Sequence, residues 1–73
     1  MKTEKLIKMA NKVGDFYRAF PNQAEARKEI AEHLNRFWNL NMRQSIADHV
    51  KENQGAGLHT WVIEAIQQHL KVN

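Results

Sequence analysis

Residues 6–21 have the sequence LIKMANKVGDFYRAFP. Apolar side chains recur there at intervals of three and four residues, at Leu6, Met9, Ala10, Val13, Phe16, Tyr17 and Phe20. On an α-helix this spacing forms one wide apolar face about four turns long. Pro21 has no N–H to donate and disfavours the α conformation in the residue before it. The pattern therefore predicts a helix over residues 4–20 that stops before Pro21.

A second helix is predicted over residues 23–38. Asn22 followed by Glu25 has the spacing of a capping box, with asparagine in place of the usual serine or threonine. The core face of this helix is expected to carry Ala26, Ile30, Ala31, Leu34, Phe37 and Trp38.

Two shorter helices follow, over residues 42–53 and 61–70. Asn41 and Thr60 are suitable N-caps for them, and Gly55 is suited to a left-handed C-terminal stop between them. Their expected core residues are Met42, Ile46 and Val50, then Val62, Ala65, Ile66 and Leu70. The last three residues, 71–73, are expected to fray. Because nothing alternates as a strand would, the predicted fold is all-α, a single compact domain of about four short helices spanning residues 1–73.

Composition limits the functions that such a domain can have. The chain of 73 residues contains no cysteine, which removes disulfides, iron–sulfur ligation and thiol nucleophiles. Its net charge of +3 is mild, and no run of 18 apolar residues or signal-peptide pattern is present, so a cytoplasmic location without a membrane span is expected. A core of this size supplies only about 3–5 kcal/mol, and a partner that buries more of it would add stability.

The polar residues form no convincing catalytic or metal-binding pattern. The histidines at positions 33, 49, 59 and 69 lack the HExxH spacing of zinc helices. Ser45, Asp48 and His49 share a helix, which offers no oxyanion hole. We therefore expect no catalytic, cofactor-binding or metal-binding residue in the chain, and an independent small enzyme ranks last among the functions considered.

A row of lysines supports a different class of function. Lys5, Lys8 and Lys12, together with Lys2, form a basic strip that could contact phosphates. Such a row is usually a solvated helix face, and the long connection between Lys51 and Leu58 does not suit a helix-turn-helix. A small basic nucleic-acid-binding or regulatory protein therefore stays as the alternative.

Large aromatic residues are numerous for so short a chain: Phe16, Tyr17, Phe20, Phe37, Trp38 and Trp61. Trp61 and Ile63 lie on either side of the predicted core row of the fourth helix, so either one of them faces away from the core or both complete it. A surplus of this kind suits docking on another protein, and in isolation it could also bring copies of the chain together as a homo-oligomer.

Several blocks of the sequence match a known family in order and spacing. They are Leu6-Ile7-Lys8-Met9-Ala10-Asn11, Val13-Gly14-Asp15-Phe16, Pro21, Ile30-Ala31-Glu32-His33-Leu34, Phe37-Trp38, Met42-Arg43 and Gly55-Ala56-Gly57-Leu58. Together they resemble the delta subunit of soluble, NAD-dependent, molybdenum-containing formate dehydrogenases, over residues 5–70. Two junctions depart from the family pattern, at Asn39-Leu40-Asn41 and at Thr60.

The resemblance implies a non-catalytic accessory subunit, whose partner is the large catalytic subunit of formate dehydrogenase and its complex. That complex is implied to carry the molybdenum cofactor, iron–sulfur clusters and FMN in other subunits. The delta subunit would stabilise the complex or assist its maturation, including molybdenum cofactor insertion, and the sequence leaves both roles open. Polar or aromatic residues within the range of the resemblance are the predicted partner contacts: Asn11, Asp15, His33, Trp38, Arg43 and Trp61.

Overall fold

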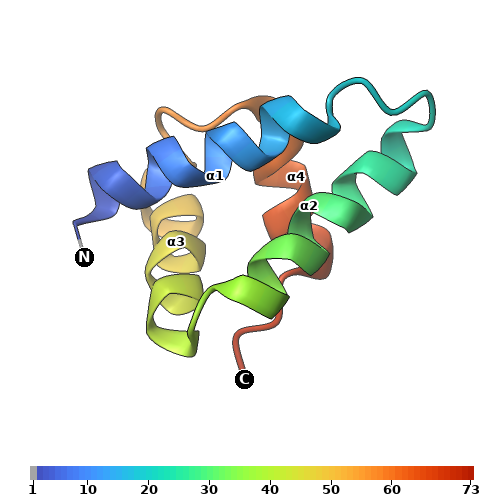
Figure 1. The fold of residues 1–73 in the computed structure, drawn as a ribbon. Coiled ribbons are helices and arrows are strands. Elements are labelled where there is room, and N and C mark those ends of the chain that lie inside the picture. Colours follow the sequence, from blue (N-terminus) through green and yellow to red (C-terminus); the bar gives the residue numbers. More distant parts are fainter. Residues whose placement is uncertain (1) are drawn as a thin grey trace.

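The computed structural model describes residues 2–73, and within that range the chain forms four α-helices joined by short connections (Figure 1). They are α1 (Thr3–Tyr17), α2 (Gln23–Phe37), α3 (Leu40–Asn53) and α4 (Thr60–His69). α2 folds back from the C-terminal end of α1, α3 lies against the N-terminal half of α1, and α4 packs most extensively against α2. The all-α fold predicted from the sequence is confirmed.

One core joins all four helices. Its buried residues are Leu6, Ala10, Leu34, Trp38, Ile46, Val50, Leu58, Val62 and Ile66. A smaller cluster of Ile30, Ala31 and Ala65 lies between α2 and α4. The radius of gyration is 10.8 Å, close to the roughly 11 Å of a compact chain of this length. The four helices therefore pack as one unit.

α1 ends three residues earlier than the predicted boundary at residue 20. The N–H of Arg18 donates to the Asp15 carbonyl at 3.4 Å, and the N–H of Phe20 donates to the Tyr17 carbonyl at 3.1 Å. These bonds span three residues, as in a tight 3₁₀-type turn. The chain therefore leaves the α conformation well before Pro21 rather than at it.

The capping asparagine of α2 is as predicted, whereas that of α3 is not. The N–H of Glu25 donates to Asn22 Oδ1 at 3.0 Å. At α3 the N–H of Met42 donates to Asn39 Oδ1 at 2.9 Å, so Asn39 is the cap and Asn41 is an ordinary residue of the first turn. The helix starts two residues earlier than predicted because the earlier asparagine satisfies its free N–H group.

The connection between α3 and α4 also differs from the prediction in detail. Left-handed backbone begins at Gln54, with φ of 58°, and continues through Gly55 at 71°. A Cβ atom on Gly55 would lie 2.8 Å from the side chain of Ile63, so glycine is required there for space as well as for conformation. His59, not Thr60, is the N-cap residue of α4, and its side chain makes no capping hydrogen bond.

Three aromatic residues that the sequence pattern placed on apolar helix faces lie on the surface. Phe16 is 72% exposed, Phe37 is 70% exposed and Phe20 is 36% exposed. The buried residues of α1 are Leu6, Ala10 and Gly14, and Phe16 follows the last of these by two residues, which turns it roughly 200° around the helix. Phe37 is the last residue of α2. Of the two aromatic residues predicted in the core at this end of the helix, only the next one, Trp38, is buried.

The C-terminal tail does not fray as predicted but is held against α2 and α3. Asn35 accepts from the N–H of Lys71 at 2.9 Å and donates to the His69 carbonyl at 3.2 Å. Arg43 donates to the Lys71 carbonyl at 2.7 Å, and the amide of Gln44 lies 3.4 Å from the Val72 carbonyl. Polar side chains of two helices therefore fix this extended segment.

Candidate interaction surface

Three of the six predicted contact residues meet where α1 passes the start of α4. Asn11 donates from Nδ2 to the Gly57 carbonyl at 2.9 Å and accepts at Oδ1 from the N–H of His59, also at 2.9 Å. Asp15 Oδ1 lies 2.9 Å from Nε2 of His59. That nitrogen is buried and makes no aligned hydrogen bond, so the pair is a close contact rather than a directed bond. Asn11 thus fixes the α3–α4 connection on α1.

Trp61 completes this junction. Its indole N–H donates to the Gly14 carbonyl at 3.0 Å, and its ring stacks on the His59 imidazole with centroids 4.5 Å apart and planes 15° apart. The guanidinium carbon of Arg18 lies 5.0 Å from the centre of the indole ring, within cation–π range. Trp61 and Ile63 are both partly buried and both pack against the core.

The other three predicted contact residues lie elsewhere. Trp38 is 5% exposed and belongs to the core, so it offers almost no surface to a partner. Arg43 donates to the Trp38 carbonyl at 3.1 Å and to the carbonyl of Lys71, which ties the end of α2 to the tail. His33 packs against the exposed ring of Phe37, with centroids 4.8 Å apart. The six residues therefore do not form one patch.

The exposed aromatic surface at the end of α1 comes from residues that the sequence pattern placed on the apolar helix face and that belong to the aromatic surplus. Phe16 and Tyr17 pack edge to face with centroids 4.9 Å apart, and Tyr17 packs in the same way on Phe20 at 5.2 Å. The three rings surround the C-terminal end of α1, with Phe16 the most exposed. The glycine inside the helical pattern at position 14, two residues before Phe16, is the sequence signal that could have revealed this surface, because such a glycine usually marks the side on which another element packs closely.

Among the polar groups considered for chemistry, His49 has structural partners. Nε2 of His49 lies 2.7 Å from the Ala56 carbonyl, and its Nδ1 lies 3.4 Å from the amide of Asn53, so both ring nitrogens contact the end of α3 and its connection. Across residues 2–73 no three His, Asp or Glu side chains gather as metal ligands would. In the same range, no helix has the length and apolar character to cross a membrane.

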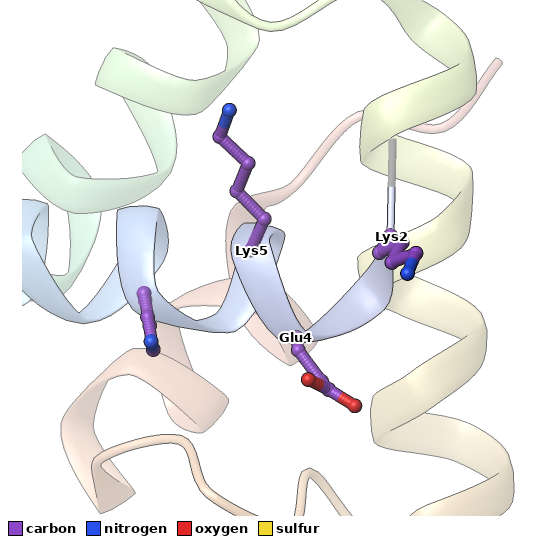
Figure 2. Close-up of a pocket in the computed structure, with 4 residues that line it drawn as sticks. Lys2, Glu4 and Lys5 are labelled. Carbon is purple, nitrogen blue, oxygen red and sulfur yellow. The ribbon is translucent and has the colours of Figure 1, made fainter.

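The basic strip surrounds a wide, open hollow at the start of α1, of about 810 Å³, lined by Lys2, Glu4, Lys5 and Lys8. Figure 2 shows that Lys5 and Glu4 point to opposite sides of the helix and that Lys2 points in a third direction. The charged ends therefore do not converge on one point where a phosphate could be held.

A comparison with protein-family models decides the family. The model described as NADH-dependent formate dehydrogenase delta subunit, FdsD, matches residues 5–66. The chain belongs to the FdsD family. Comparisons with curated proteins and with solved structures found no significant match. The resemblance stated from the sequence blocks is confirmed.

The FdsD match covers the features that build the surface described above. It includes the aromatic end of α1 and the junction of Asn11 with the α3–α4 connection, and it extends into α4 beyond Trp61. The C-terminal tail, which side chains of α2 and α3 hold in place, lies outside the matched range. As a delta subunit of a formate dehydrogenase, this FdsD chain is one component of a larger enzyme.

Proposed function

We propose that the chain is a non-catalytic accessory subunit that docks on the large catalytic subunit of an NAD-dependent, molybdenum-containing formate dehydrogenase. By docking it stabilises the assembled enzyme or assists its maturation during molybdenum cofactor insertion. The observation that carries the proposal is the aromatic end of α1 in a member of the FdsD family. Phe16 is 72% exposed and packs on Tyr17, which in turn packs on Phe20. Large aromatic residues are typical anchors of protein interfaces.

The redox centres of the complex are assigned to the other subunits because the donor groups of this chain do not suit them. Iron–sulfur clusters are held by cysteine thiolates, and the sequence has no cysteine. The clustered His59 and Asp15 are engaged with each other and with the α1–α4 junction. This chain supplies surface for docking rather than reactive groups.

Co-purification tests the proposal directly. The tag belongs at the N-terminus, because the C-terminal tail is held by side chains of α2 and α3. The tagged chain should capture the large subunit in stoichiometric amounts, and cells lacking the chain should lose formate-dependent NAD reduction. Absence of capture together with unchanged activity would refute the proposal, and binding of DNA or RNA that falls steeply with salt would favour the nucleic-acid alternative.

Add-back separates the two roles. Enzyme purified without the chain is assayed for molybdenum, then mixed with purified chain. If molybdenum is present and activity returns on mixing, the chain stabilises the assembled enzyme. If molybdenum is missing and activity does not return, the chain acts before cofactor insertion is complete.

A further inference from the structure

Beside the aromatic end of α1 lies a hollow of about 370 Å³, where this end meets the first turns of α2 and α4. Phe20, Ala26 and Trp61 give it apolar walls. Its volume is at the lower end of the roughly 300–1,000 Å³ of pockets that hold small molecules. A hollow of this volume can also hold a side chain of a protein partner.

Two charged residues line the hollow, Glu64 and Arg18, and within the described residues only Glu64 has an oppositely charged partner. The carboxylate of Glu64 lies 3.9 Å from the guanidinium of Arg27 on α2. Arg18 is exposed, and within residues 2–73 it forms no salt bridge with a carboxylate. Its guanidinium is instead placed over the Trp61 ring, at 5.0 Å from the centroid. The hollow therefore presents an apolar wall beside one unpaired cation held in position.

An occupant that complements this site must supply both an apolar group and a negative charge. A guanidinium offers five N–H donors in a planar fork that matches a carboxylate, and stacking on an aromatic ring leaves its edge free to donate. Phe20, which lines the hollow, packs on the partly buried ring of Tyr17, and Tyr17 packs on the exposed ring of Phe16, so the hollow is linked to Phe16 through these ring contacts. An extended contact of a protein segment fits this layout better than a single small molecule.

We propose that this hollow receives a segment of the large catalytic subunit that carries a large apolar side chain next to an aspartate or glutamate. The apolar side chain packs against Phe20 and Trp61, and the carboxylate accepts hydrogen bonds from Arg18. This inference rests on the proposed function for the identity of the partner, and it adds the place and the chemistry of the contact.

Charge reversal at Arg18 tests the electrostatic part. Arg18→Glu should weaken capture of the large subunit by about tenfold or more, because it removes a central Arg and sets like charges against each other. Lys12→Glu is the matched control, since it makes the same charge change on an exposed residue of α1 that does not line the hollow, and it should alter capture by about twofold or less. Equal melting temperatures of the two variants and the parent chain show that both are folded.

The outcomes separate this inference from the proposed function. If the parent chain does not capture the large subunit, the proposed function fails. If the parent captures it and Arg18→Glu captures it equally well, only the assignment of the hollow fails. Equal losses for Arg18→Glu and Lys12→Glu would mean that net charge alone controls association, and would also overturn the assignment.

A photo-crosslinking residue at Gln23, which lines the hollow, tests the identity of the occupant. In the assembled complex it should cross-link to a peptide of the large subunit that contains an acidic residue adjacent to a large apolar one. The same photo-crosslinker at Lys51, exposed on α3, should not capture that peptide. Cross-linking to a second copy of this chain, or to a peptide without an acidic residue, would overturn the proposed occupant.

Discussion

Replacing Gly14 by alanine should destabilise the protein, although the same change in most helix interiors stabilises it. Gly14 lies in α1, where alanine is ordinarily favoured by about 1 kcal/mol. A Cβ atom there would overlap Cγ2 of Val62 and would lie 3.1 Å from Nε1 of Trp61. Val62 is fully buried and β-branched, so it has little freedom to rotate away.

The net effect follows from two opposing contributions. Overpacking of a core costs about 1–3 kcal/mol, and displacement of Trp61 would also weaken its hydrogen bond to the Gly14 carbonyl, which contributes about 1 kcal/mol. After the gain in helix propensity is subtracted, Gly14→Ala should lower the free energy of unfolding by about 1–3 kcal/mol. For a domain of this size that corresponds to a fall in melting temperature of roughly 4–24 °C, measurable by circular dichroism.

A double-mutant cycle with Val62→Ala identifies the cause. Removing the Val62 methyl groups opens the space that the new Cβ needs, so Gly14→Ala should be neutral or stabilising by up to about 1 kcal/mol in that background. Because Val62→Ala itself weakens the core, the cycle is best measured in an osmolyte that strengthens burial. A stabilising effect of Gly14→Ala in the parent chain, or an equal cost in both backgrounds, would refute the reasoning.

Three further predictions test other parts of the structure by urea denaturation and hydrogen exchange. Asn11→Ala removes both hydrogen bonds to the α3–α4 connection and should cost about 1–3 kcal/mol; a change below the measurement error would show that the connection does not depend on it. Asn39→Ala should cost about 1 kcal/mol as a lost N-cap, while Asn41→Ala should change stability by about 0.5 kcal/mol or less, and the reverse order would restore the cap predicted from the sequence. Arg43→Ala should speed amide exchange in the C-terminal tail, and Arg43→Lys should recover only part of the protection because lysine lacks the planar fork.

The number of helices and most of the core could be predicted from the sequence because the spacing of the apolar residues and the positions of the helix-breaking residues indicate the same four helices. Leu6, Ala10, Ile30, Leu34 and Ile46 are at the predicted spacing and are fully or almost fully buried. Pro21 and the glycines of the α3–α4 connection mark the two clearest breaks. These signals depend on residues close in sequence, which is why they survive without knowledge of the packing.

The aromatic residues could not be placed correctly because an apolar face can be wider than the surface available to cover it. The spacing of Phe16 and Phe37 is compatible with a core position, but burial also requires a neighbouring helix at that point. α4 packs on the side of α1 that carries Gly14, and the small residue permits the close approach. Phe16 is left outside by this choice of side, which no local pattern records.

The predicted contact residues illustrate the same limit for function. Asn11, Trp38 and Arg43 were predicted as partner contacts, yet their side chains make contacts within the domain. Asn11 binds the α3–α4 connection, Trp38 is buried in the core, and Arg43 binds the C-terminal tail. Residues separated by more than 25 positions meet in these contacts. A sequence match marks them as part of the family pattern without indicating whether they serve the fold or the partner.

Trp61 links the internal junction to the outer surface of this domain. Its N–H is satisfied by the Gly14 carbonyl, one neighbour of its ring is the His59 imidazole, and the ring also lines the hollow beneath Arg18. A chain without disulfides that folds around a small core must hold such a residue with long-range contacts to keep a docking surface in shape. The hydrogen bonds from α1 to the α3–α4 connection provide this support, so the docking surface that we propose is preorganised by the same residues that stabilise the fold.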